Sequence, residues 1–191
     1  MDEKQIGWGD VPERYKGEKV TEKQMKDAES MGRLPVGKYL CTCIDSRPKQ
    51  KNPKSEDGSP APSYFVANLK WRVDSVVEID RKPVSGDEGE QYEGRFIFDE
   101  IALQKDGEKD GMRNRRIMVA KRTGIMAATG REIPTDAWSK LIIGKRALIS
   151  HVEETYKDKT GVDQIRRKVA FDGYESADKA VKAGGDTFSD I

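Results

Sequence analysis

The clearest structural signal is the stretch YFVANLKWRVDSVV, residues 64–77, in which apolar and polar side chains alternate over most of its length. Alternation with a period of two is typical of a β-strand that buries one face. The residues expected to face the core are Phe65, Ala67, Leu69, Trp71 and Val73. The residues expected to face outwards are Tyr64, Asn68, Lys70, Arg72 and Asp74. The stretch therefore predicts a long strand in a sheet-based fold.

The same period predicts further strands on both sides of this one. They are expected at residues 38–44, 95–103, 145–156 and 164–174. Two helical segments, 114–129 and a shorter one that starts at Thr135 or Asp136, separate the third strand from the fourth. Five strands with a helical insertion between the third and fourth have the order of an OB-fold barrel. We therefore expect a mainly β fold, a five-stranded OB-like antiparallel barrel, although a small antiparallel α+β sheet would give the same order.

Length and composition favour one domain with polar appendages. The chain has 191 residues, of which 36% are charged and 35% hydrophobic. We expect an N-terminal arm at residues 1–33 with a short helix after a capping box at Thr21, the barrel at 34–174, and a flexible C-terminal tail at 175–191. The sequence contains neither an apolar run of membrane-spanning length nor an N-terminal signal region. These features predict a cytoplasmic protein.

Residues that could carry catalysis are few, and the sequence predicts no enzyme. Cys41 and Cys43 are interpreted as core thiols, and with His151 they are too few for a zinc site. His151 lies in mid-strand without a nucleophile motif nearby. The acid-x-Lys triplet in residues 78–82, together with Asp74, leaves a metal-dependent nuclease open as a minor alternative. We expect no cofactor and no metal.

Basic residues are segregated along the chain although the net charge is only +1. One cluster, on the first predicted helical segment, consists of Arg113, Arg115, Arg116, Lys121 and Arg122. Two more clusters are Arg166-Arg167-Lys168 on the last strand and Arg47, Lys49, Lys51 and Lys54 in the first loop. Compensating acids gather between Glu78 and Glu93. Segregated charge of this kind can present one positive face to phosphates, whereas a single cluster is more often only a solvated face.

Aromatic residues accompany these cations on the predicted strands. Tyr64 shares the polar side of its strand with Lys70 and Arg72, and Phe96 and Phe98 alternate with Arg95 and Ile97. Rings among cations suit single-stranded nucleic acid, because bases stack on the rings while the cations follow the backbone. The sequence leaves open which side of residues 95–103 faces the core. The predicted nucleic-acid-binding residues are Tyr64, Lys70, Arg72, Phe96, Phe98, Arg113, Arg115, Arg116, Lys121, Arg122, Arg166 and Lys168.

Four short motifs add a resemblance to a known family. In chain order they are Gly37-Lys38-Tyr39, Tyr92-Glu93-Gly94-Arg95 leading into Phe96-Ile97-Phe98-Asp99, Leu141-Ile142-Ile143-Gly144-Lys145-Arg146, and Glu153-Glu154-Thr155-Tyr156-Lys157. Over residues 34–174 the chain resembles the single-stranded-DNA-binding proteins of bacteriophages and prophages, which have an OB-type barrel. The resemblance implies DNA binding without strong sequence preference, in replication or recombination in the bacterial cytoplasm, and without enzymatic activity. The long arm, the proline-rich first loop and the extra length near residues 105–112 depart from the family pattern.

Two further expectations concern partners. OB-like barrels serve many functions, so a protein–protein adaptor or a virion-associated module without nucleic-acid binding is the alternative. The C-terminal tip, residues 186–191, resembles in a shorter form the acidic tips with which bacterial single-strand-binding proteins recruit partners. Phe188, Asp190 and Ile191 are the predicted partner-binding residues, with an inert terminus as the alternative.

Overall fold

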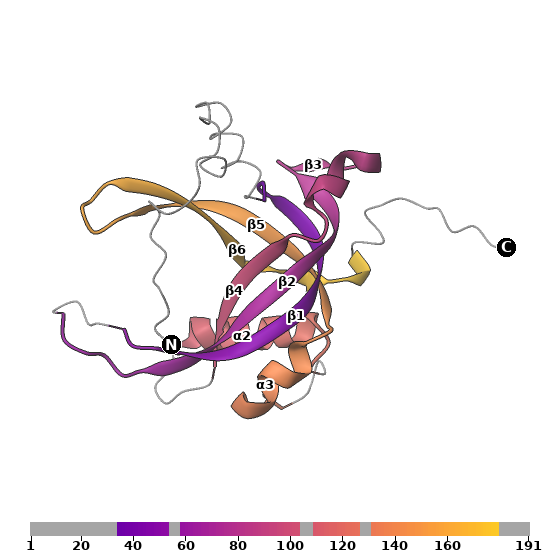
Figure 1. The fold of residues 1–191 in the computed structure, drawn as a ribbon. Helices are drawn as coiled ribbons and strands as arrows, with labels where there is room; N and C mark the ends of the chain where they lie inside the picture. The colour runs from indigo at the N-terminus through magenta and orange to yellow at the C-terminus, as the bar shows by residue number, and fades with distance from the viewer. Residues whose placement is uncertain (1–33, 54–57, 104–108, 127–130, 180–191) are drawn as a thin grey trace, which may run out of the picture. The chain divides into compact units, whose positions relative to one another are not determined.

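The computed structural model describes residues 34–53, 58–103, 109–126 and 131–179 (Figure 1). The predicted N-terminal arm and the predicted partner-binding residues Phe188, Asp190 and Ile191 lie outside these ranges. The elements in chain order are the strands β1 (Gly37–Lys51), β2 (Tyr64–Ile79) and β3 (Lys82–Pro83), the 3-10 helix η3 (Gly86–Tyr92), strand β4 (Phe96–Ala102), the helices α2 (Asp110–Arg122) and α3 (Thr135–Ile142), and the strands β5 (Arg146–Lys157) and β6 (Asp163–Ser176). The fold is mainly β, as the alternation predicts.

One antiparallel sheet contains all of these strands. Its order is β3-β2-β1-β5-β6, and β4 pairs with β2 on the same side as the short β3. The long strands β1 and β2 pair along their whole length, and β1 also pairs with β5. In the described part of the chain no ladder joins β4 to β6, although the two strands approach each other. The sheet is therefore not closed into the expected barrel, and among the described strands β4 and β6 have no strand partner on their outer edges.

The core lies on the face of the sheet that the alternation predicts for β1 and β2. Tyr39, Cys41 and Cys43 of β1 are fully buried, as are Leu69 and Trp71 of β2. Both cysteines are free thiols, and burial raises the pKa of Cys43 to about 12. They therefore fill the core as small apolar groups, in agreement with the sequence interpretation.

The beginning of β2 departs from the predicted alternation. Phe65 is expected in the core but is 51% exposed, whereas its neighbour Val66 is buried. Phe65 pairs with Gln50, in a part of the β1–β2 hairpin where residues 47–50 of β1 are exposed. The hairpin continues beyond the packed core at this end, so Phe65 is left exposed although it lies on the core side of β2.

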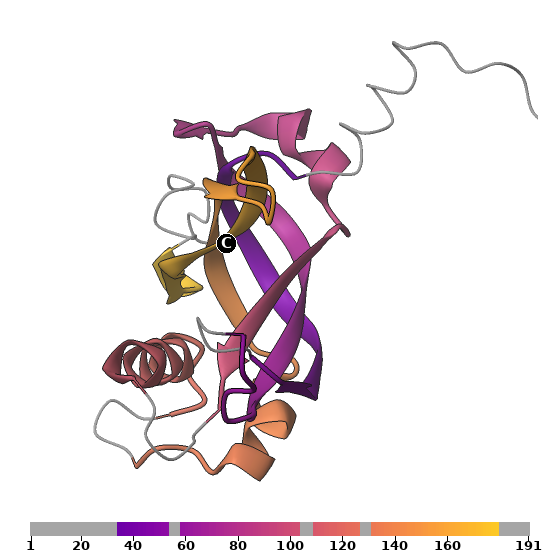
Figure 2. The ribbon, with the colours of Figure 1, turned by 90° about the vertical axis from the view of Figure 1, so that its left-hand side faces the viewer.

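The α-helices α2 and α3 lie at one end of the sheet (Figures 1 and 2). Helix α2 packs against the edge strands β4 and β6, and α3 packs against β1 through a face that buries Trp138 and Ile142. The β5–β6 hairpin extends away from the helices. No helix in the described ranges combines the length and apolarity needed to span a membrane.

Candidate nucleic-acid interface

Two phenylalanine rings of β4 lie on the outer side of the sheet. Phe96 is 44% and Phe98 61% exposed, whereas Ile97 between them is buried. Phe98 is the direct partner of Lys70 in β2, and Phe96 is the partner of Arg72. Because directly paired residues project to the same side of a sheet, rings and cations share one surface. We call Phe96, Phe98, Lys70 and Arg72 the aromatic face. In β4 the side with Ile97 therefore faces the core and the side with Phe96 and Phe98 faces outwards, which the sequence leaves open.

The rings of the aromatic face are spaced for separate contacts. Two residues along a strand correspond to about 6.7 Å, so Phe96 and Phe98 present neighbouring but distinct ring surfaces. The Lys70 ammonium lies 3.9 Å from the centroid of the Phe96 ring, a cation–π contact. Among the described residues Lys70 makes no ion pair, so its charge stays available beside the ring.

A hollow of about 410 Å³ connects Phe98 with strand β6. Its lining consists of Asn68, Phe98, Asp99, Glu100, Arg166 and Lys168. The tertiary structure therefore brings the predicted cations Arg166 and Lys168, about 70 residues further along the chain, next to Phe98. This hollow joins residues from β2, β4 and β6 on one surface, and three of them are predicted site residues: Phe98, Arg166 and Lys168.

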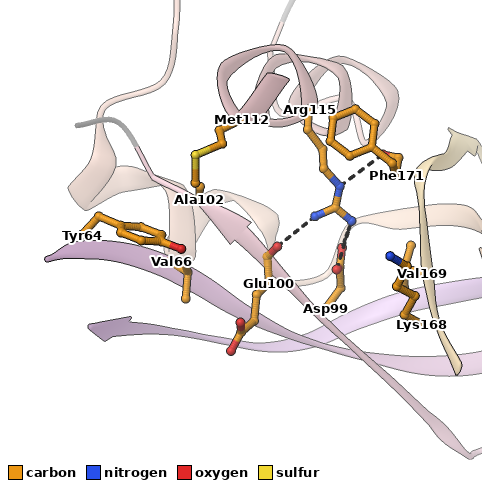
Figure 3. A pocket seen from close by; sticks show the side chains of 10 residues that line it. All are labelled: Tyr64, Val66, Asp99, Glu100, Ala102, Met112, Arg115, Lys168, Val169 and Phe171. Atoms are coloured by element: carbon orange, nitrogen blue, oxygen red, sulfur yellow. Dashed lines mark hydrogen bonds and ion pairs between the residues drawn. The ribbon is translucent and has the colours of Figure 1, made fainter. Parts of the chain in front are cut away.

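A second hollow, of about 310 Å³, lies between the free edges of β4 and β6 (Figure 3). It is lined by Tyr64, Val66, Asp99, Glu100, Ala102, Met112, Arg115, Lys168, Val169 and Phe171. Tyr64 is half-buried here, as the first residue of β2 on the same side of the strand as Lys70. Tyr64 thus contributes to the second hollow, whereas Phe98 contributes to the first.

Arg115 of α2 spans the gap between the two strand edges in this second hollow (Figure 3). It donates hydrogen bonds to the Glu100 carbonyl on β4 at 2.9 Å and to the Phe171 carbonyl on β6 at 3.1 Å. Its Nη2 also contacts both carboxylate oxygens of Asp99, at 3.0 and 2.8 Å. Burial raises the pKa of Asp99, and the contacts with Arg115 and with the Tyr174 hydroxyl only partly offset this effect. Arg115 therefore joins two strand edges that have no ladder between them.

Two other arginines of the predicted α2 cluster have the same structural role. Arg116 is 1% exposed and donates to the Ala102 carbonyl at 3.0 Å and to the Glu132 carboxylate at 2.7 Å. Arg122 donates to the carbonyls of Asp172, at 2.9 Å, and Tyr174. Arg115 is thus largely buried and Arg116 fully buried, and both bond to carbonyls of β4 and to a carboxylate, whereas Arg122 is exposed and bonds to two carbonyls of β6. Phosphate binding by these three residues stays a prediction.

The remaining cations of α2 are exposed but lie outside both hollows. Arg113 is exposed and pairs with Glu132 at 3.5 Å, and Lys121 is exposed near the end of the helix. Neither residue lines the hollow beside Phe98 or the one beside Tyr64. Nucleic-acid binding by Arg113 and Lys121 therefore stays a prediction, and neither residue is connected to the aromatic face by these hollows.

Sequence reasoning overlooked Arg146 at the start of β5. Arg146 is level with Arg72 across the sheet, because Thr42 of β1 pairs with both residues. Its Nε lies 3.6 Å from Asp74 Oδ2. In the sequence, Arg146 is only one of two basic residues, Lys145-Arg146, at the start of a strand. The sheet register is needed to place Arg146 beside the aromatic face.

The described residues contain no group of three or more His, Cys, Asp or Glu side chains that could hold a metal ion. No protein-family model matches the chain, and the search of curated proteins found no match either. These two comparisons therefore assign no function to the chain.

Proposed function

We propose that this protein binds single-stranded DNA without strong sequence preference, through the aromatic face and the adjacent cations of β6. The observation that carries the proposal is the exposure of Phe96 and Phe98 directly opposite Lys70 and Arg72. Contiguous exposed apolar surface points to a binding site more strongly than a single exposed ring does, and here two exposed rings are neighbours on one side of a strand. Base stacking uses ring faces and is tolerant of sequence, because every base has a π-face.

The strand connections support an open OB-like architecture as part of this proposal. If β1, β2, β4, β5 and β6 are taken as the five barrel strands, the helical insertion falls between the third and fourth. The gap between β4 and β6 corresponds to a barrel that is partly open. By the family resemblance, the protein acts in phage or prophage replication or recombination in the bacterial cytoplasm, as a binding protein without enzymatic activity or cofactor.

One observation favours a second candidate, a protein-binding adaptor. Most cations near the aromatic face pair with carboxylates, among them Arg72 with Asp74 at 3.0 Å and Arg166 with Glu154 at 2.6 Å. Paired charges weaken the attraction for a polyanion but leave exposed rings free to pack against a protein.

Titration with fluorescently labelled oligo-dT separates the candidates. The DNA-binding proposal expects a rise in anisotropy that weakens linearly on a log–log plot against salt. A labelled duplex of the same length is the control, and it should bind more weakly because its bases cannot reach the rings. A repeat with magnesium and analysis of the oligonucleotide tests for cleavage. If oligo-dT does not bind even at low salt, the adaptor candidate replaces the proposal.

A further inference from the structure

Three carboxylates near the aromatic face each hold two cations, in the same arrangement. Glu100 binds Lys49 with one oxygen at 3.2 Å and Lys51 with the other at 2.6 Å. Glu154 binds Arg166 with one oxygen at 2.6 Å and Lys168 with the other at 2.5 Å. In every case each carboxylate oxygen takes one cation, so each cluster keeps a net charge of +1.

The third cluster is built on Asp74, which is more buried than the other two carboxylates. Arg72 contacts one of its oxygens at 3.0 Å, and Arg146 lies 3.6 Å from the other. The Thr42 hydroxyl also donates to Asp74. Asp74 is therefore partly structural, whereas Glu100 and Glu154 have the two cations as their main partners.

The three clusters surround the aromatic face. Arg72 is the strand partner of Phe96, and Glu100 follows Phe98 by two residues on the same side of β4. Arg166 and Lys168 line the hollow beside Phe98. Phe96 and Glu100 are four residues apart, about 13 Å along the strand, so the clusters at the two ends of the face are separate positions that one phosphate cannot bridge.

Their cation partners favour the ionised form of Glu154 and of Glu100. Hydrogen bonds from Lys168 and Arg166 lower the pKa of Glu154. Burial alone would raise the pKa of Glu100, but hydrogen bonds from Lys51 and Lys49 outweigh it and the pKa is lowered. In the free protein each cation is thus already neutralised in part, and it retains donor hydrogens that point away from the carboxylate.

The surface around the rings has limited positive charge as a result. Counting the three clusters, Lys70, and the Arg47–Asp45 pair opposite Lys70 gives eight cations and four carboxylates, which leaves +4. Eight independent cations would attract a polyanion far more strongly than this surface does.

We propose that each carboxylate-bridged pair of cations is one phosphate position, and that its carboxylate is a built-in competitor which weakens the binding of single-stranded DNA. This inference rests on the proposed function and specifies how it works. One phosphate binds across both cations of a pair, so three clusters account for about three phosphates and a log–log salt slope of about −2. When the carboxylate is removed, the two cations are free to neutralise two phosphates instead of one.

Glu154→Gln tests the inference, because Glu154 is half-exposed and lies in the β5–β6 hairpin away from the core. The matched control is Glu153→Gln, since Glu153 is its neighbour on β5, projects to the opposite side and pairs with Arg167 at 3.6 Å. Both variants change the net charge by the same amount. Binding of labelled oligo-dT is measured by anisotropy for the wild-type protein and both variants over a series of salt concentrations.

The expected result is about threefold to tenfold tighter binding for Glu154→Gln at low salt, with a slope more negative by about 0.7. Glu153→Gln should stay within about twofold of the wild type. Equal gains in the two variants would mean that only net charge matters, and weaker binding of Glu154→Gln would mean that the carboxylate positions the cations; either result overturns the inference while the proposed function stands. If neither the wild-type protein nor a variant binds, the proposed function fails and the inference fails with it.

Discussion

At the scale of single residues, the contrast between Phe98 and Ile97 determines what the outer side of β4 can do. The two side chains are adjacent in sequence, yet one is 61% exposed and the other is buried at 2%. Strand geometry alone produces this difference, because neighbouring residues project to opposite sides of the sheet. An exposed position, for which we propose a binding role, and a packing position therefore alternate along one strand, and substitutions can separate them.

Phe98→Ala should weaken oligo-dT binding by about 1–3 kcal/mol, which is the contribution of one stacked base. Its melting temperature should stay close to that of the wild type, since the ring has few packing contacts to lose. Ile97→Ala should instead lower the free energy of unfolding by about 2–4 kcal/mol, because it creates a cavity. Anisotropy and thermal denaturation measure the two effects, and similar behaviour of the two variants would contradict the assignment of strand faces.

His151, the single histidine of the chain, makes stability depend on pH near neutrality. Its Nδ1 lies 3.3 Å from the Pro35 carbonyl, and burial, with a smaller effect of Arg167, lowers its pKa below the ordinary value of 6.5. The folded state thus binds fewer protons than the unfolded state between the two pKa values, so stability rises with pH in that window. The stability that depends on neutral His151 should be fully present above pH 6.5 and should decrease as the pH falls below that value.

Urea denaturation at pH 7.5, 6.5 and 5.5 measures this dependence. His151→Gln is the control, because its amide can still donate to Pro35 but does not titrate. The variant should show a flatter pH profile across this range. An equally steep decline in the variant would assign the pH dependence to other groups.

At the scale of elements, α2 replaces strand pairing with side-chain hydrogen bonds. Free strand edges leave backbone carbonyls without partners, and a buried carbonyl without a partner costs free energy. Arg115 and Arg116 satisfy the carbonyls of Glu100 and Ala102 on β4, while Arg115 and Arg122 reach those of Phe171, Asp172 and Tyr174 on β6. The helix therefore depends on its arginines for its position on the sheet.

Arg115→Lys should destabilise the fold by about 1–3 kcal/mol although it preserves the charge, because one ammonium cannot reach both strand edges and Asp99 as the planar guanidinium does. Oligo-dT affinity of the folded variant should stay near the wild-type value. Arg113→Lys is the control, since Arg113 is exposed on the same helix. If Arg115→Lys binds DNA much more weakly while its stability is unchanged, Arg115 is a phosphate contact after all.

At the scale of the whole described fold, the central strand β1 is paired on both sides, whereas the side of the sheet between β4 and β6 has no ladder. β1 pairs with β2 and with β5, whereas β4 and β6 each pair with a single long neighbour. Amides with ladder partners on both sides open only when larger parts of the fold open. The side between β4 and β6 also carries the hollows beside Phe98 and Tyr64.

Hydrogen exchange should follow this arrangement. Backbone amides of β1 from Tyr39 to Cys43 should exchange slowest, and those of β4 and of residues 163–168 in β6 much faster. Oligo-dT should slow exchange in β4 and β6 and leave β1 unchanged if the aromatic face binds DNA. Uniformly slow exchange in β1, β4 and β6 without DNA would indicate a closed barrel instead.

The local pattern along the chain was sufficient for the strands and for part of the site. Alternation predicted β2 and the buried side of β1, and the order of strands and helices predicted a mainly β fold with a helical insertion. The outward position of Lys70 and Arg72 also followed from alternation. These features depend on the geometry of a single strand, in which the side of each residue is set by its position in the sequence.

Other features required the assembled sheet. Whether Phe96 and Phe98 face outwards depends on the partner strand, since Arg95 and Phe96 begin a segment in which either side could be buried. The roles of Arg115, Arg116 and Arg122 depend on strand edges in other parts of the chain, and no spacing within the helix distinguishes them from Arg113. Phe65 lies at the limit of the core, a boundary that packing defines and alternation cannot. Burial and pairing are thus properties of contacts between distant segments. For this reason only the tertiary structure could separate the arginines that bond to strand edges from the rings and cations that are exposed on the aromatic face.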